Sequence, residues 1–181
     1  MQTLKLHLQK LGPLRPAAWA HIAEKIVSLQ LKENESLIRE AGTIAFVSDG
    51  LLKEYNPYER TKPSIVNFIC AHQYIVNRRH NQGHFIRACC PSMVYSLAWP
   101  AIADLFHRYP ELKQIHDGIG EQYDIALFYR QLVLEERLAA NRISLFIQKN
   151  RSILPRLKKK DIANYLHLDY DHFVRHYSKL L

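Results

Sequence analysis

Hydrophobic and polar positions change their spacing several times along the chain. Between residues 2 and 30 the apolar positions recur at helical spacing, and Pro13 and Pro16 stand near the start of this segment. The apolar face of the predicted helix carries Trp19, Ile22, Ala23, Ile26 and Val27. We therefore expect the chain to open with helical structure.

Between about residues 29 and 99 the helical spacing gives way to runs of four to seven residues that are rich in Ile, Val, Phe and Tyr. Several runs are separated by Gly, Asn, Pro or Asp, which favour turns. The runs are SLQL, SLIRE, TIAFVS, LLKEY, SIVNFIC, QYIVN, HFIRA and MVYSLAW. So many short strands joined by turns predict an antiparallel barrel or sandwich.

Helical spacing returns at residue 100. Pro100 suits the first turn of a short helix within residues 100–112, and Pro110 ends it. A longer helix is predicted over residues 117–149, and its apolar stripe packs either on its own domain or against a second copy of the chain. We expect a homodimer whose seam consists of Leu127, Leu134, Leu138 and Leu145.

The last segment follows Pro155 and a basic run, and reads KKKDIANYLHLDYDHFVRHYSKLL. Its apolar positions predict two short amphipathic helices, with the small Ala163 where they cross and with Asp169 or Asp171 as the cap of the second. Ile162, Ala163 and Leu166 lie on one helical face, and Leu166, Leu168 and Phe173 fill the shared core. This is the spacing of a helix-turn-helix, whose second helix enters the DNA major groove.

Two features of this segment oppose DNA binding. The turn position that most such motifs fill with Gly, because it needs a positive φ, is His167. Asp169 and Asp171 place negative charge at the end that would enter the groove. Against them, the residues from Pro155 onward include six basic and three acidic side chains, a local net charge of +3. The alternative therefore stays open: a ligand- or protein-interaction module that does not bind DNA.

Composition narrows the class of protein further. The 181 residues include 25 Lys and Arg against 17 Asp and Glu, a formal net charge of +8, which favours a polyanionic partner such as nucleic acid. The three cysteines form no CxxC pair, so we expect free thiols in a reducing compartment. No signal peptide and no run of about 18 apolar residues is found, and we expect a soluble, cytoplasmic protein without membrane contact. Ten scattered histidines without HExxH or a comparable spacing give no reason to expect an enzyme.

The collinear series of segments resembles the Crp/Fnr (catabolite-activator-like) family of bacterial transcription regulators, in the short form common in Bacteroidetes. The matching pieces, from about residue 22 to the end, are LQLKENESLIREAG, IAFVSDGLLKEY with Gly50 at a turn, FIRACCPSMVYSLAWPAIADLFHRYPEL, and DIANYLHLDYDHFVR. The resemblance implies an α+β fold: a double-stranded β-roll (a jelly-roll-like cyclic-nucleotide-binding-domain fold) with flanking helices, a long central helix and a small C-terminal helix-turn-helix. We accordingly divide the chain into a sensor roll with its N-terminal helix (residues 1–116), a connecting and dimerising helix (117–149) and a DNA-binding unit (150–181).

Family members that bind cyclic AMP hold its phosphate with a Gly-Glu pair and, further on, an arginine followed by Ser or Thr. Residues 69–88, ICAHQYIVNRRHNQGHFIRA, contain no Gly-Glu pair, and the arginine position holds Gln82. Cyclic-nucleotide binding is therefore doubtful, and we expect no cofactor. Arg78 and Arg79, with Gln82 and the neighbouring His80, form a weak candidate site for an unidentified small anionic effector, or else a solvated basic hairpin tip. The cysteine cluster of the family's iron–sulfur sensors is absent, so no metal is expected.

The resemblance also implies which residues contact DNA, because its recognition-helix arginine falls on Arg175. The expected phosphate contacts are Lys158, Lys159, Lys160 and Lys179, and the expected base-edge contacts are His172, Arg175 and His176. The alternative for Arg175 is a surface salt bridge to Asp171, four residues back. The expected function is transcription regulation through double-stranded DNA, with an altered or lost cyclic-nucleotide site.

Overall fold

The computed structural model describes residues 1–180, except for the side chain of His80. The α-helices are α1 (Gln2–Leu11), α2 (Pro16–Lys25), α3 (Trp99–Arg108), α4 (Leu112–Glu135), α5 (Ala139–Asn150), α6 (Lys159–Tyr165) and α7 (Tyr170–Tyr177). The strands are β1 (Val27–Leu31), β2 (Ser36–Leu37), β3 (Ile44–Asp49), β4 (Leu51–Asn56), β5 (Ser64–Cys70), β6 (Tyr74–Val76), β7 (Phe85–Ala88) and β8 (Ser92–Leu97). Two short 3₁₀ turns are η1 (Arg79–Asn81) and η2 (Leu154–Arg156).

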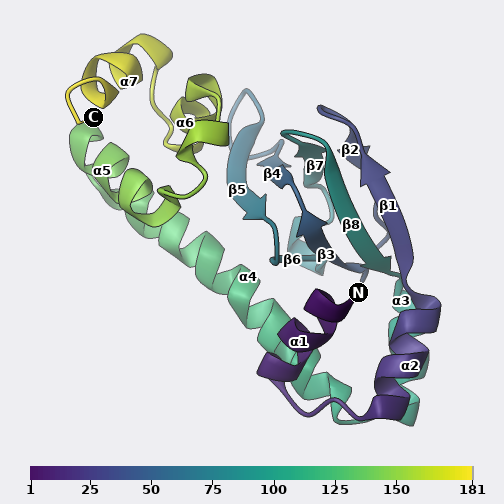
Figure 1. Ribbon diagram of the computed structural model, residues 1–181. Helices are drawn as coiled ribbons and strands as arrows, with labels where there is room; N and C mark the ends of the chain where they lie inside the picture. The colour runs from purple at the N-terminus through teal and green to yellow at the C-terminus, as the bar shows by residue number, and fades with distance from the viewer. Residues whose placement is uncertain (181) are drawn as a thin grey trace.

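The strands form a roll of two antiparallel four-stranded sheets, in the orders β1-β8-β3-β6 and β2-β7-β4-β5. Each of the eight short runs found in the sequence supplies one strand, so the predicted antiparallel β-domain and the α+β fold class are confirmed. Figure 1 shows the N-terminal helices at one end of the roll and the terminal helices at the other. The core between the sheets consists of Leu31, Leu37, Ala45, Val47, Leu52, Ile69, Ile75, Ile86, Ala88 and Val94.

The chain crosses from one sheet to the other at Gly50, between the last residue of β3 and the first of β4. Gly50 has a φ of 110°, and a Cβ atom at this position would overlap the Ser92 hydroxyl of β8. That hydroxyl accepts a hydrogen bond from the backbone N–H of Leu51 at 3.3 Å. The turn expected at Gly50 therefore needs glycine for its backbone angle and for the close approach of β8.

The N-terminal segment is not one helix over residues 2–30. α1 ends at Leu11 and α2 begins at Pro16, because prolines at 13 and 16 disfavour helical geometry at the residues before them. Of the predicted apolar face, Ile22 is buried, but Val27 begins β1 and is exposed. The helical spacing was correct for α1 and α2, but it was extended across the break at residues 12–15 and past the end of α2 at Lys25.

The predicted long helix over residues 117–149 is interrupted. α4 starts earlier, at Leu112, and ends at Glu135, while Glu136 and Leu138 have extended backbone angles before α5 begins. The freed Glu136 carbonyl accepts a hydrogen bond from Nε of Arg142 at 2.7 Å. α3 does end before Pro110, as predicted. Although α4 has 24 residues, neither it nor any other described helix is long and apolar enough to cross a membrane.

Two further apolar cores hold the helices to the roll. The helical core joins α1–α4 to the β3–β6 face and contains Leu4, Leu8, Ile22, Phe46, Tyr74, Leu105, Ile115 and Ile119. The terminal core joins the other sheet to α4–α7 and contains Leu51, Ile65, Phe68, Val133, Ile143, Phe146, Ile162, Leu166 and Phe173. The terminal helices are therefore packed directly on the roll.

Candidate nucleic-acid interface and roll interior

Helices α6 and α7 have the geometry expected of a helix-turn-helix. His167, in the turn, has a φ of 55°, the left-handed angle that the motif needs and that glycine usually supplies. Asp169 caps α7, because its carboxylate accepts the backbone N–H groups of Asp171 at 3.0 Å and His172 at 3.2 Å. Of the two capping candidates, Asp169 is therefore the one that caps.

The buried face of the two helices matches the predicted core. Ala163, Leu166 and Phe173 are buried, and Leu168 is half-buried against them. The small Ala163 lies in the part of α6 that faces the terminal core, which allows close packing of the crossing helices. Lys159 and Lys160 at the start of α6, and Asp171, His172 and Arg175 of α7, are exposed.

The predicted phosphate contacts of α6 are all exposed, but they differ in their surroundings. Lys158 pairs with Glu33 of the β1–β2 turn at 3.0 Å, so its charge is partly compensated. Nζ of Lys159 lies 5.7 Å from the centre of the Tyr177 ring, and Nζ of Lys160 lies 5.7 Å from that of Tyr170. Lys159 and Lys160 therefore remain available to an anion.

On α7 the predicted base-contacting side chains share one face. The rings of His172 and His176 lie 4.6 Å apart, one turn from each other. Arg175 is exposed, and its Nε lies 3.4 Å from the backbone oxygen of Asp171, so the predicted alternative of an ion pair with the Asp171 carboxylate is not formed. Lys179 is exposed just beyond the end of α7.

A buried ion pair joins the roll to α6, and sequence reasoning missed it. Nζ of Lys53 on β4 lies 2.8 Å from Oδ2 of Asp161, and both side chains are largely buried. The amide of Asn164 adds two hydrogen bonds, accepting from the N–H of Ile65 at 2.6 Å and donating to the carbonyl of Pro63 at 3.0 Å. The available signal was a lysine inside the apolar run LLKEY, which needs a partner when it is buried.

A second junction centres on His167. Arg130 of α4 donates two hydrogen bonds to the carboxylate of Glu59, at 2.8 and 2.9 Å, and its Nη2 lies 2.8 Å from Nε2 of His167. Burial raises the pKa of Glu59, but the hydrogen bonds and charge of Arg130 outweigh it and hold that pKa low. Burial and the charges of Arg60 and Arg130 lower the pKa of His167, and the Glu59 carboxylate, whose Oε2 lies 3.3 Å from Nε2 of His167, opposes them. The turn residue that departs from glycine thus contacts both the roll and α4.

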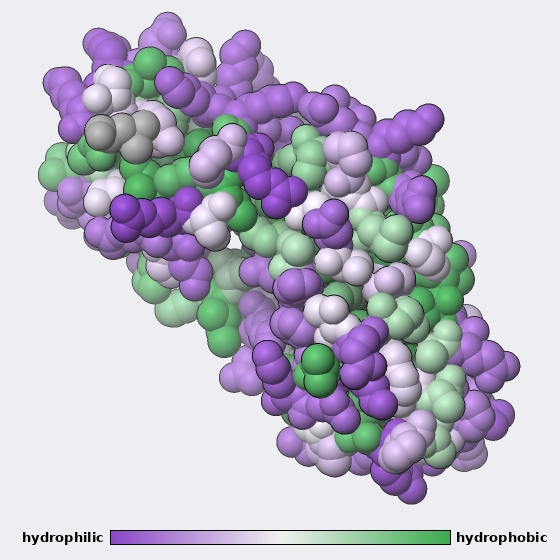
Figure 2. Space-filling view, viewed as in Figure 1, coloured by the Kyte–Doolittle hydropathy of each residue, from purple (hydrophilic) through white to green (hydrophobic). Residues whose placement is uncertain are grey.

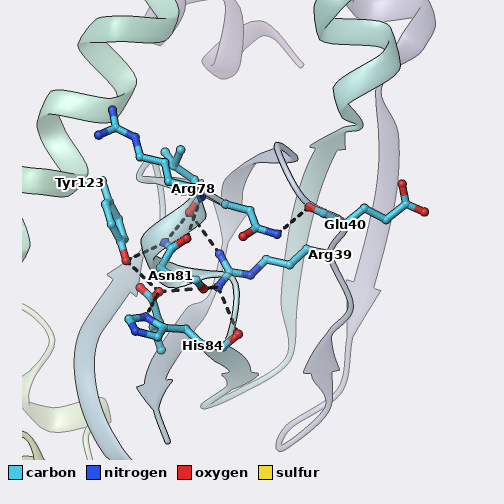
Figure 3. Close-up of polar contacts among 9 residues, drawn as sticks. Arg39, Glu40, Arg78, Asn81, His84 and Tyr123 are labelled. Carbon is cyan, nitrogen blue, oxygen red and sulfur yellow. Dashed lines mark hydrogen bonds and ion pairs between the residues drawn. The ribbon is translucent and has the colours of Figure 1, made fainter. Parts of the chain in front are cut away.

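The interior of the roll contains a closed polar cluster, which we call the roll cluster: Arg39, Glu54, Asn81, His84 and Tyr123 (Figure 3). Glu54 is fully buried, and its Oε1 accepts hydrogen bonds from the Tyr123 hydroxyl and from Nδ1 of His84, each at 2.9 Å. Arg39 lies 3.7 Å from the same oxygen and donates to the carbonyl of Val76 at 3.2 Å. Asn81 donates to the Tyr123 hydroxyl at 2.8 Å, so α4 is joined to the roll through this ring.

The charges of the roll cluster compensate one another. Burial lowers the pKa of Arg39, and the charge of Glu54 opposes that effect. Burial raises the pKa of Tyr123, and the nearby Glu54 charge adds to it, so the hydroxyl keeps the proton that it donates. Arg39 is already engaged with a carboxylate and backbone carbonyls. A phosphate entering here would meet the buried charge of Glu54.

The three residues of the weak ligand site do not converge. Arg78 turns toward α4, where it pairs with Asp124 at 2.7 Å and lies so close to Gly120 that a Cβ atom there would overlap its guanidinium group. Arg79 and Gln82 are exposed on the turn between β6 and β7. The side chain of His80 lies outside the described part of the structure. These residues form no common anion pocket.

The exposed apolar row on α4 differs from the seam predicted by sequence. Leu127 packs on the helical core, Leu145 packs on the terminal core, and Leu134 is half-buried. Only Leu138 of the predicted four is exposed, and it lies in the break between α4 and α5. The large apolar side chains that α4 exposes are Ile125, Phe128 and Leu132, at 56%, 61% and 45%.

The cysteines and histidines of the described residues form no metal site, since no group of three or more His, Cys, Asp or Glu side chains there could hold a metal ion. All three thiols are free. Burial raises the pKa of Cys89 to about 11, with smaller effects from nearby charges, so this thiol is protonated at neutral pH.

Comparison with known proteins places the fold. Neither family models nor curated proteins give a match to the sequence. Solved structures do match. FixK2 from Bradyrhizobium japonicum has a TM-score of 0.73 and 14% identity, and the match covers 86% of this chain and 84% of that one. A crp/fnr-family transcriptional regulator from Eubacterium rectale has a TM-score of 0.73 and 11% identity, and the match covers 90% of this chain and 82% of that one. A cyclic nucleotide-binding domain containing protein from Listeria monocytogenes is similar over 98% of this chain and 90% of that one, with a TM-score of 0.70 and 14% identity. The chain therefore has the fold of Crp/Fnr transcription regulators and cyclic nucleotide-binding proteins.

Proposed function

We propose that this chain is a DNA-binding transcriptional regulator, because it combines the fold of such regulators with an exposed cationic face on an intact helix-turn-helix. That cationic face carries the proposal. Lys160 and Arg175 are exposed and form no ion pair with any described residue, although buried charges elsewhere in the chain are paired. The net charge of +8 acts in the same direction and favours association with a polyanion.

The proposed contacts follow the exposure of the side chains. Lys159, Lys160 and Lys179 contact backbone phosphates, and His172, Arg175 and His176 face base edges. Lys158 contributes less, since Glu33 already pairs with it. An arginine that reaches a guanine adds about 1–3 kcal/mol of discrimination between bases.

The proposal includes a roll that no longer binds a cyclic nucleotide in the manner of the family. The engaged Arg39 supports this, because a ring phosphate needs a free guanidinium and that of Arg39 is already held by Glu54 and the carbonyl of Val76. Gln82, at the arginine position of the resemblance, is exposed. An anionic effector at Arg78 and Arg79 loses support, since Arg78 is paired with Asp124.

We also propose a homodimer, with its seam moved to the exposed row Ile125, Phe128 and Leu132 of α4. Successive members of this row are three and four residues apart, so they lie on one face of the helix, as the residues of a helix–helix contact do. Light scattering at tens of micromolar protein should give the dimer mass for the wild type and the monomer mass for Phe128→Asp. A monomeric wild type would refute this part of the proposal.

The DNA proposal is tested by fluorescence anisotropy with a labelled random DNA duplex, across salt from about 50 to 200 mM. The test variant is Arg175→Ala with Lys160→Ala. The matched control is Lys25→Ala with Lys113→Ala, which removes the same charge from exposed positions on α2 and α4, at the opposite end of the molecule (Figure 1).

The wild type should bind with an affinity that falls steeply as salt rises, and the test variant should bind more weakly and with a smaller salt slope than the control. Equal losses in test and control would mean that overall charge, and not the terminal unit (residues 150–181), attracts DNA. A folded wild type that does not bind at low salt would favour the alternative, an interaction module that works through the roll or α4.

A further inference from the structure

The hairpin between β4 and β5 lies beside the helix-turn-helix. β4 ends at Asn56 and β5 begins at Ser64, and these two residues are partners in the register, so residues 57–63 form the tip. In Figure 1 this tip rises next to α6, at the same end of the molecule as α7. Figure 2 shows hydrophilic side chains along that edge of the molecule.

The tip is fixed to α6 by hydrogen bonds and is not a free loop. Asn164 bonds the backbone of Pro63 and Ile65, as described above. Arg60 donates from Nε to the Ser64 hydroxyl at 2.8 Å and from Nη2 to the carbonyl of Asn164 at 3.2 Å. A fixed tip binds a partner without a further cost of ordering the loop.

The carboxylate of the tip is turned away from this contact. Glu59 is engaged by Arg130 on the α4 side, so its charge is compensated there. Lys62 is exposed, and no hydrogen bond or ion pair joins it to another described residue. The tip therefore presents uncompensated positive charge toward the terminal unit.

A cleft of about 370 Å³ separates the tip from the terminal helices. Arg60, Thr61 and Lys62 line one wall, and Lys160, Asp169 and Tyr170 belong to the other. Three cations thus face one carboxylate, and that carboxylate, Asp169, already accepts two backbone N–H groups at the start of α7. The cleft therefore offers positive charge and hydroxyl donors to a phosphodiester.

We propose that this cleft binds a backbone phosphate of duplex DNA, so that the roll hairpin, through Lys62, adds a DNA contact outside the helix-turn-helix. The inference rests on the proposed function and extends the interface from α6 and α7 to the roll. The cleft adjoins the first turn of α7, where Tyr170 and Asp169 lie. A helix entering the major groove brings phosphates of the flanking backbone to that end.

The test compares Lys62→Ala with Lys113→Ala, an equal charge change at the far end of α4, in the same anisotropy salt series. For Lys62→Ala we expect about one phosphate contact fewer: a salt slope smaller by about 0.9 and a Kd about fivefold higher near 0.15 M salt. Lys62→Arg should bind like the wild type, because it keeps the charge. Thermal unfolding of all three variants should match the wild type, since both lysines are exposed.

Equal binding by Lys62→Ala and Lys113→Ala, while Arg175→Ala with Lys160→Ala still weakens binding, would overturn the cleft and leave the proposed function intact. Loss of binding by Lys62→Arg as well as Lys62→Ala would also overturn it, because the effect would not be one of charge. A wild type without salt-dependent binding would refute the proposed function itself.

Discussion

The roll interior and the terminal unit use charge in opposite ways. In the roll cluster, Arg39, Glu54 and His84 are buried and bond one another. On the terminal unit, Lys160 and Arg175 are exposed and have no carboxylate partner among the described residues. Charges that are compensated inside the protein hold its parts together, and exposed charges without partners attract an external polyanion. The comparison therefore leads us to expect that substitutions in the roll cluster lower stability and that substitutions on the terminal helices weaken the proposed DNA binding.

The largest effect is expected from Glu54→Ala, which removes the acceptor shared by Tyr123, His84 and Arg39. Leaving buried donors and a guanidinium without their anion should lower the free energy of unfolding by about 3–5 kcal/mol, measured by urea denaturation. Glu121→Ala, at an exposed position of α4, is the control and should stay within about 0.5 kcal/mol of the wild type. Unchanged stability of Glu54→Ala would show that the roll cluster does not hold the roll together.

Breaking the ion pair between the two regions should have a smaller effect. Lys53→Met leaves the Asp161 carboxylate without its cation in a largely buried site, and should cost about 1–3 kcal/mol. Glu33→Ala breaks the exposed ion pair between the roll and Lys158 at the start of α6. This variant should lower the free energy of unfolding by about 0–1 kcal/mol. If the urea midpoints of Lys53→Met and Glu33→Ala shifted equally, burial would not explain the contribution of the Lys53–Asp161 pair to stability.

Substitutions at His167 separate backbone strain from side-chain contact. Both His167→Ala and His167→Gly lose the contact with Arg130, but only glycine adopts a φ of 55° without a steric cost. His167→Ala should therefore be less stable than His167→Gly by about 1 kcal/mol in urea denaturation. Equal stabilities would mean that the turn relaxes away from this angle.

The smallest effect is a dependence on pH at the same junction. Burial and the charges of Arg60 and Arg130 lower the pKa of His167 in the folded chain, so the unfolded chain takes up the proton first as pH falls below about 6.5. The free energy of unfolding should decrease from there until the folded-state histidine is also protonated. His167→Asn tolerates the turn angle and does not titrate, so the urea midpoint of this variant should lack that step. A step of the same size in His167→Asn would assign it to another group.

The sequence predicted the elements whose cause is local. Alternating apolar runs gave all eight strands, and the order of Ile162, Ala163, Leu166 and Phe173 gave both terminal helices. The break at residues 136–138 could not be predicted, because LEERLAA contains no glycine or proline. It arises when α5 packs Ile143 and Phe146 into the terminal core, a tertiary effect that overrides helix propensity.

The sites were predicted unevenly for the same reason. The cations of the terminal unit lie close together in sequence and were found there. Arg39, Glu54 and Tyr123 are far apart along the chain and meet only when the roll closes over α4, so each alone was an unremarked polar residue. Of the four predicted seam residues only Leu138 is exposed, since a spacing of sevens was carried across a break that the sequence does not reveal.

The contact between Asn164 and the start of β5 has a further consequence. β5 is the outer strand of its sheet, and such a strand offers unpaired backbone groups to any other chain that can pair with it. Here α6 lies along it: the amide of Asn164 takes the place of a neighbouring strand at Ile65, and Phe68 is covered by Phe146 and Tyr165. The terminal helices thus prevent β5 from pairing with a strand of another molecule. A chain cut before α6 should expose this apolar edge strand and aggregate through it.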